Sequence, residues 1–166
     1  MFKWMKMMKQ ATNDYHLLTL AEIKQNQDDD SDNLLFLDFD GVFFIMHETP
    51  GEVMGRINKL CERYAFHIVV SSSWRGNWDV ALKALEDAHC KAVIDGATEL
   101  SSKSRPQQIL TYLNEHHYRN FLILDDAYLP GLEDHHIKTD MNDGFTEKRY
   151  QQAIKTYDQL LSHKII

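Results

Sequence analysis

Short apolar runs alternate along this chain with segments of helical periodicity, and that alternation restricts the possible fold more than any other feature. The runs predict buried strands at residues 34–38, 66–71, 91–95, 121–125 and, more weakly, 136–140. Segments with apolar residues at helical spacing fill the gaps between them. Repeated strand–helix alternation is typical of a mainly parallel sheet with helices on both faces. The predicted fold class is therefore α/β, a three-layer α/β/α sandwich.

Local capping signals predict where the helices begin. The sequence TPGE, which starts at Thr49, is a capping box with proline at the first helical position. Ser104 is expected to cap a later helix, and the last helix is expected to begin near Thr146. Another helix is expected from about Asn77, and the residues predicted to face the core from it are Trp78, Leu82 and Leu85.

Length and composition indicate one domain with an N-terminal extension. The chain has 166 residues, of which 43% are hydrophobic, and this is enough apolar material for a single core. Residues 1–33 are expected to form a leader that contains a short helix, with Thr19 and Glu22 as its capping box, and the acidic linker DDDSDN. Residues 34–166 are expected to form the α/β domain.

Charge and apolar content argue against several classes of protein. The formal net charge is −7, with 18 basic and 25 acidic side chains, so the chain is not expected to coat nucleic acid electrostatically, although recognition of one phosphate stays open. No apolar run approaches the ~20 residues of a membrane span. The basic start MFKWMKMMKQ lacks the features of a signal peptide, and Cys61 and Cys90 are expected to be reduced thiols. A cytoplasmic location is therefore expected.

Carboxylates follow two of the predicted strands. Asp38 ends the first strand with Asp40 just beyond it, and Asp125 and Asp126 end a later one. Because ligands bind beyond the carboxyl ends of parallel strands, we expect these side chains to meet at one edge of the sheet. Crowded carboxylates repel one another unless a cation lies among them, and an all-oxygen ligand set favours a hard ion such as Mg²⁺.

Hydroxyl and basic side chains are predicted at the same edge. Ser71 and Ser72 end the second strand, and Lys103 and Arg105 lie at the start of a helix. A carboxylate near a bound cation can attack phosphorus, while a hydroxyl and a cationic side chain hold the phosphoryl oxygens. The following residues, Trp74-Arg75, either flank this site or form a packed aromatic and a surface salt bridge.

These segments, taken in order, resemble the haloacid dehalogenase (HAD) superfamily of phosphohydrolases. The resemblance rests on DFDG after the first strand, serine after the second, a basic residue that opens a helix, and DD after a further strand. IVVSSSWR, the R-x-x-x-I spacing from Arg105 to Ile109, ILDD and HIKTD…GFT are similar to the small HAD domains of Swiss Army Knife RNA-repair proteins. The resemblance implies a Rossmann-like, HAD-like catalytic domain, with Mg²⁺ as its cofactor.

The resemblance also implies roles for the acidic residues. Asp38 corresponds to the nucleophile and a Mg²⁺ ligand. Asp40 corresponds to the general acid and base, and it offers its backbone carbonyl to the metal. Asp125 corresponds to a direct metal ligand, and Asp126 to a carboxylate that supports it. The implied reaction is hydrolysis of a phosphomonoester through an aspartyl-phosphate.

The phosphate-binding residues are carried over with an alternative at each position. Ser72 corresponds to the phosphate-binding hydroxyl, with Ser71 as the alternative because the end of the strand is uncertain by one residue. Arg105 corresponds to the phosphate-binding cation, but the superfamily more often has lysine there, so Lys103 is the alternative.

Many members of the superfamily cover the site with an inserted cap domain, for which this chain has no room. Residues 41–49 separate Asp40 from the helix at Pro50, and residues 96–103 separate Asp95 from Ser104. Neither gap holds a domain, so a capless (C0) arrangement with an open site is expected. An open site suits a phosphate on a large substrate, either a nucleic-acid end or a phosphoprotein.

Two other functions compete with this interpretation. One is a phosphatase or nucleotidase for small molecules; the acidic net charge favours a small phosphorylated compound or a phosphoprotein over a nucleic-acid substrate. The other is a non-catalytic phosphate- or metal-binding module, which would be expected to lack Asp38 or Asp40, and both are present. A receiver domain is less suitable. Its acidic pair comes early and its phosphorylated aspartate lies in mid-chain, whereas this chain has DxD early and DD late. The sequence does not predict an oligomeric state.

Overall fold

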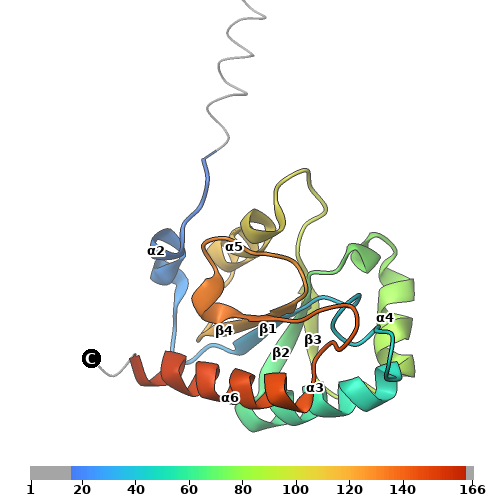
Figure 1. The fold of residues 1–166 in the computed structure, drawn as a ribbon. Coiled ribbons are helices and arrows are strands. Elements are labelled where there is room, and N and C mark those ends of the chain that lie inside the picture. The colour runs from blue at the N-terminus through green and yellow to red at the C-terminus, as the bar shows by residue number, and fades with distance from the viewer. Residues whose placement is uncertain (1–15, 164–166) are drawn as a thin grey trace, which may run out of the picture.

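The computed structural model describes residues 16–163 and contains a five-stranded parallel sheet (Figure 1). Its strands are β1 (Asn33–Leu37), β2 (Phe66–Val70), β3 (Ile94–Ala97), β4 (Phe121–Asp125) and β5 (His136–Lys138). They lie in the order β3-β2-β1-β4-β5, and every neighbouring pair is parallel. The chain therefore leaves the central strand β1 toward one side of the sheet and returns on the other.

Helices cover both faces of this sheet, as the predicted three-layer sandwich requires (Figure 1). One face packs against α3 (Pro50–Tyr64), α4 (Trp78–Asp87) and α6 (Glu147–Ser162). The other packs against α2 (Leu20–Ile23) and α5 (Arg105–Glu115). Short 3₁₀ helices are η1 (Lys24–Asn26), η2 (Ser73–Gly76) and η3 (Glu133–His135). The α/β fold class is confirmed, and none of the connections within residues 16–163 forms a cap domain.

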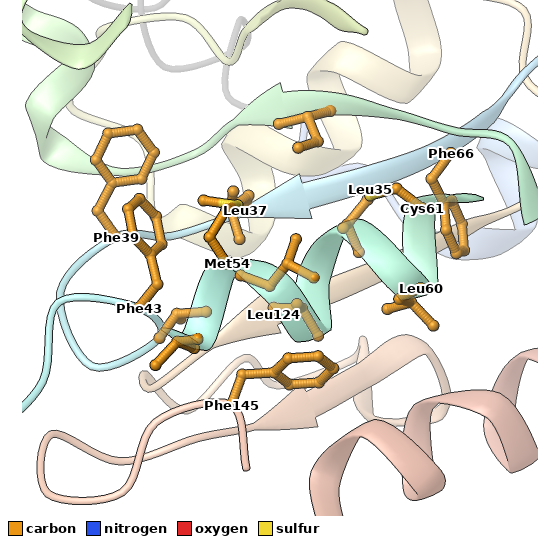
Figure 2. Close-up of a cluster of buried hydrophobic side chains, with 14 of the residues drawn as sticks. Leu35, Leu37, Phe39, Phe43, Met54, Leu60, Cys61, Phe66, Leu124 and Phe145 are labelled. Atoms are coloured by element: carbon orange, nitrogen blue, oxygen red, sulfur yellow. The ribbon is translucent and has the colours of Figure 1, made fainter. Parts of the chain in front are cut away.

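Strand β1 contributes to two separate cores, which explains why it is apolar throughout. Leu35 and Leu37 belong to the cluster beneath α3, and Figure 2 shows Leu37 close to Met54 and Leu35 nearer to Cys61. Leu34 and Phe36 belong to the cluster beneath α5. Because successive strand residues point to opposite faces, a strand covered on both sides needs apolar residues at every position.

The predicted capping box at Thr49 is confirmed. The Thr49 hydroxyl accepts a hydrogen bond from the Glu52 backbone N–H at 3.3 Å, and the Glu52 carboxylate accepts one from the Thr49 N–H at 3.1 Å. Ser104 caps α5 as predicted, and α6 begins where predicted, with Thr146 as its N-cap. Thr19 precedes α2, but its side chain accepts no backbone hydrogen bond, so the capping box predicted there is not formed.

Two predictions about individual elements are wrong. The third strand is β3, at Ile94–Ala97 instead of 91–95, because its position depends on pairing with β2 and not on its apolar content. Leu82 is exposed, whereas Leu85 is buried and Trp78 packs on the core as predicted, and α4 buries Ala81 and Ala84 in addition.

The segment before the sheet packs on the domain. The backbone of Leu18 and the side-chain amide of Gln107 exchange hydrogen bonds of 2.9 and 3.0 Å. Ile23 is fully buried, and the Asn26 amide donates to carbonyl groups at the end of α5. The first part of the predicted leader, residues 1–15, lies outside the described residues. Within 16–163, no helix is long and apolar enough to cross a membrane.

Candidate active site

The carboxyl edge of the sheet brings together the acidic residues that the sequence singles out. Asp38 follows β1 directly, and its backbone N–H donates to the Leu124 carbonyl at 3.0 Å. Leu37 pairs with Leu124, so the next positions along the two strands are Asp38 and Asp125. These strands flank the point where the connections diverge, which is where parallel sheets open a crevice for ligands.

Three carboxylates meet there in a largely buried cluster. Oxygen atoms of Asp38, Asp125 and Asp126 all lie within 4.8 Å of one another. Burial, followed by the charge of Asp125, raises the pKa of Asp38 to about 7. A cation among these groups would offset the repulsion, and the ligand set contains oxygen only. The residues therefore fit a hard divalent ion such as Mg²⁺.

Gly41 is required by the position of Asp126. Gly41 has a positive φ of 78°, and a Cβ atom added to it would overlap the Asp126 carboxylate. Only glycine combines this backbone conformation with such a close approach. The glycine of the DFDG sequence thus makes room for a carboxylate that lies far away in the chain.

Arg105 reaches the acidic cluster, whereas Lys103 does not. The Arg105 Nη1 atom donates to Asp38 Oδ2 at 3.1 Å and to both carboxylate oxygens of Asp125 at 3.0 Å. Burial lowers the pKa of Arg105, but Asp125 and Asp38 outweigh it and raise this pKa overall. The Lys103 ammonium instead pairs with Glu99 at 3.0 Å.

Ser71 and Ser72 are both fully buried at the end of β2, but their hydroxyls differ. The Ser72 hydroxyl accepts the Trp74 backbone N–H at 3.2 Å and so caps the 3₁₀ helix η2. The Ser71 hydroxyl has no hydrogen-bond partner among residues 16–163. Ser71 continues the strand register beside Asp38, since its N–H donates to the Leu37 carbonyl.

Asp40 follows Asp38 by two residues, with Phe39 between them. Its side chain contacts the loop after β2. Its Oδ2 accepts a hydrogen bond from the indole Nε1 of Trp74 at 3.0 Å. The Trp74 ring stacks on Phe44, with 4.7 Å between ring centroids and 22° between planes. Trp74 therefore lies beside Asp40 and is also a packed aromatic, so the two expectations stated as alternatives for it both apply.

Arg75 is a buried structural residue and does not form the surface salt bridge that was the alternative expectation. Its guanidinium donates to the carbonyls of Ser72 at 2.7 Å and Thr98 at 3.1 Å, and to the side chain of Gln108 at 2.8 Å. Burial lowers the pKa of Arg75, and the charge of Arg105 lowers it further. Arg75 thus joins the ends of β2 and β3 to α5.

Sequence reasoning did not assign a role to Thr139, which braces the site from β5. Its backbone N–H donates to the Asp125 carbonyl at 3.0 Å, and its hydroxyl donates to the Gly41 carbonyl. His136 contacts the same Asp125 carbonyl at 2.9 Å. The sequence signal for Thr139 was the similarity of HIKTD to the family pattern. That similarity indicated membership of the family but did not indicate which residues Thr139 contacts.

Comparison with known proteins agrees with this arrangement. Residues 34–150 match the family described as "HAD domain in Swiss Army Knife RNA repair proteins". No curated protein matches the chain. No solved structure matches it either. The family match covers well over half of the chain and contains every residue of the acidic cluster, together with Asp40 and Arg105. The chain therefore belongs to the HAD domain family of Swiss Army Knife RNA repair proteins, whose fold implies phosphohydrolase chemistry.

Proposed function

We propose that the protein is a Mg²⁺-dependent phosphomonoester hydrolase that acts through an aspartyl-phosphate on Asp38. The main support is the position of Asp38, which lies in register with Asp125 at the switch point and within hydrogen-bond reach of Arg105. A nucleophile, a cation site and a phosphate-binding cation would thereby share one crevice. Phosphoryl transfer depends mainly on such positioning and on stabilisation of charge.

The metal would be held by the carboxylates of Asp38 and Asp125 and by the backbone carbonyl of Asp40, with Asp126 in support. When bound, Mg²⁺ would neutralise charge on the phosphoryl group and reduce its repulsion from the carboxylates. Asp38 keeps its backbone hydrogen bond, in which Oδ1 accepts the Phe39 N–H at 2.9 Å. Its Oδ2 is the oxygen that points to Arg105, and we assign the attack to that atom.

The reaction would proceed in two steps, transfer of the phosphoryl group to Asp38 and its hydrolysis. Asp38 attacks phosphorus, a bond from Asp38 to phosphorus forms, and the bond to the leaving oxygen breaks as Asp40 gives that oxygen its proton. Asp40 then takes a proton from water, which attacks phosphorus and breaks the Asp38–phosphorus bond to release inorganic phosphate. Arg105 and Ser72, or Ser71 in its place, would hold the phosphoryl oxygens throughout.

The open edge of the sheet supports a large substrate. The segment after Asp40 is a tight turn, closed by hydrogen bonds from Gly41 N–H to the Phe44 carbonyl and from Val42 N–H to the Phe39 carbonyl, both near 3 Å. No cap rises over the site from this turn or from the loop before α5. We propose a macromolecular phosphate, on a nucleic-acid end or a phosphoprotein. The description of the family, which refers to RNA repair, favours the nucleic-acid end.

Release of phosphate from a panel of substrates, with Mg²⁺ or with EDTA, tests this function. The panel contains an aryl phosphate, phosphotyrosine and phosphoserine peptides, nucleotides, and oligonucleotides phosphorylated at the 3′ or 5′ end. We expect Mg²⁺-dependent turnover that EDTA abolishes and that Asp38→Asn also abolishes. Turnover by the Asp38→Asn variant would exclude the aspartyl-phosphate. A preference for free nucleotides would indicate a small-molecule nucleotidase, and a folded protein inactive on the whole panel would indicate a binding module.

A further inference from the structure

We infer that Trp74 is a positioning residue for Asp40: its indole N–H fixes the carboxyl group that protonates the leaving oxygen. This inference rests on the proposed function, since it concerns the acid of that reaction. It gives a specific task to a residue of the loop after β2 that was expected above at most to flank the site. The observation behind it is the 3.0 Å hydrogen bond from Trp74 Nε1 to Asp40 Oδ2.

The Trp74 ring is itself held in place from several sides. Its backbone N–H is tied to the Ser72 hydroxyl at 3.2 Å. Its ring packs on Phe39, with 5.6 Å between centroids, and stacks on Phe44 at 4.7 Å. The direction of the indole N–H is thus determined by the packed aromatic cluster, and an aromatic side chain has few rotatable bonds to lose.

The carboxyl group of Asp40 has little else to orient it. Among the described residues, the bond from Trp74 is the one hydrogen bond that the Asp40 side chain forms. Its backbone is fixed by the turn that returns to Phe44, where Gly41 N–H donates to the Phe44 carbonyl at 3.0 Å. The main chain is therefore constrained independently of Trp74, whereas rotation of the carboxyl group depends on it.

The indole also distinguishes the two carboxyl oxygens of Asp40. An indole N–H donates and cannot accept, so Trp74 engages Oδ2 as an acceptor and leaves Oδ1 for the leaving group. This matters because a general acid must present its proton to one defined atom. Phe39, which follows Asp38, packs on the Trp74 ring. The same aromatic cluster therefore holds the acid, Asp40, and the nucleophile, Asp38, in fixed relative positions.

The test compares Trp74→Phe with the wild type on two classes of substrate. Phenylalanine keeps an aromatic ring but removes the N–H. A p-nitrophenyl phosphate has a leaving group that needs no proton, whereas an alkyl phosphate, such as a phosphoserine peptide, needs one. The value of kcat/KM covers substrate binding and phosphoryl transfer to Asp38 and excludes the later hydrolysis of the aspartyl-phosphate. We expect kcat/KM for the alkyl substrate to fall at least tenfold more than for the aryl substrate, within the ~10²–10⁴-fold worth of a general acid.

Three controls separate positioning from folding. Trp78→Phe makes the same change on α4 at a half-buried tryptophan and should leave the ratio of the two substrates unchanged. Thermal unfolding of Trp74→Phe should stay close to that of the wild type. Asp40→Asn should show the same substrate pattern, and the double variant should lose no more than Asp40→Asn alone, because Trp74 acts through Asp40.

Several outcomes would overturn the inference. An equal loss on both substrates would mean that Trp74 is only structural. A faster alkyl reaction in Trp74→Phe would mean that the indole holds Asp40 away from the leaving group. Additive losses in the double variant would mean that Trp74 does not act through Asp40. Failure of the proposed function is seen separately, as turnover by Asp38→Asn or as no substrate preference in Asp40→Asn.

Discussion

Asp38 combines burial with a position beside another carboxylate, so its charged form opposes folding in the absence of metal. Its pKa rises from about 3.8 to about 7 in the folded state, because of burial first and Asp125 second, although Arg105 acts in the opposite direction. The folded state then binds more protons at this group than the unfolded state between those pH values, so stability falls as pH rises through that window. The charged carboxylate that the proposed reaction needs as its nucleophile therefore lowers the stability of the metal-free fold.

Asp38→Asn should therefore abolish turnover and yet stabilise the metal-free protein. With EDTA present, the variant's free energy of unfolding should exceed that of the wild type only slightly near pH 4. The difference should grow as pH rises to about 7 and level off above it. Relief of ~2 kcal/mol would raise Tm by roughly 4–8 °C in a domain of this size. Thermal unfolding across this pH range measures the effect. A variant less stable than the wild type at pH 8 would show that Asp38 contributes favourable contacts beyond its charge.

Arg105 and Lys103 form a matched pair for assigning the phosphate-binding cation. Arg105 contacts Asp38 and Asp125, whereas Lys103 pairs with Glu99 at a distance from the cluster. Arg105→Met should lower kcat/KM by at least ~10²-fold, as expected for loss of a charge that stabilises the transition state. Lys103→Met should change it less than about threefold. Steady-state kinetics of both variants measures this, and the reverse pattern would assign the role to Lys103.

At the scale of elements, the loop after β2 depends on a buried arginine. The Arg75 guanidinium supplies donors to several carbonyls at the ends of β2 and β3, among them Ser71, Ser72 and Glu99. Arg75→Ala would remove this donor from the buried carbonyls of Ser71 and Ser72, each at a cost of about 1–3 kcal/mol. We expect a loss of ~2–4 kcal/mol in the free energy of unfolding, together with loss of activity because η2 carries Trp74.

Urea denaturation measures that loss. Lys83→Ala is the control, because Lys83 is exposed and forms only a surface ion pair with Asp87. The control should change stability by less than ~0.5 kcal/mol. If Arg75→Ala were equally harmless, water would be able to replace the guanidinium, and the loop would not depend on it.

The sequence predicts elements well where their signals are local. The capping box at Thr49 lies within four residues, and it forms as predicted. The position of β3 depends on pairing with β2, a contact between distant residues, and the prediction was wrong by several residues. The carboxylates of the candidate site could be foreseen because strand ends in a parallel sheet share one edge. The bond between Trp74 and Asp40 could not, since no periodicity relates these two positions.

At the scale of the whole molecule, a five-stranded sheet without a cap leaves the candidate site open. A mononucleotide would then make few contacts, whereas a longer strand could lie across the carboxyl edge. For an oligonucleotide substrate, kcat/KM should rise at least tenfold from a 3′-phosphorylated mononucleotide to a strand of several nucleotides. With a net charge of −7, this gain should depend weakly on salt. Equal values along the length series would instead support a small-molecule phosphatase.

The central claim is that phosphate passes through a covalent bond to Asp38, and the Asp40→Asn variant offers the most direct view of it. With p-nitrophenyl phosphate the first step needs no proton, but the second lacks its base, so the aspartyl-phosphate should accumulate. The measurement is peptide mass spectrometry after acid quench, with Mg²⁺ present. The account predicts a phosphate adduct on Asp38, absent with EDTA. Continued turnover with no adduct, or an adduct on another residue, would contradict it.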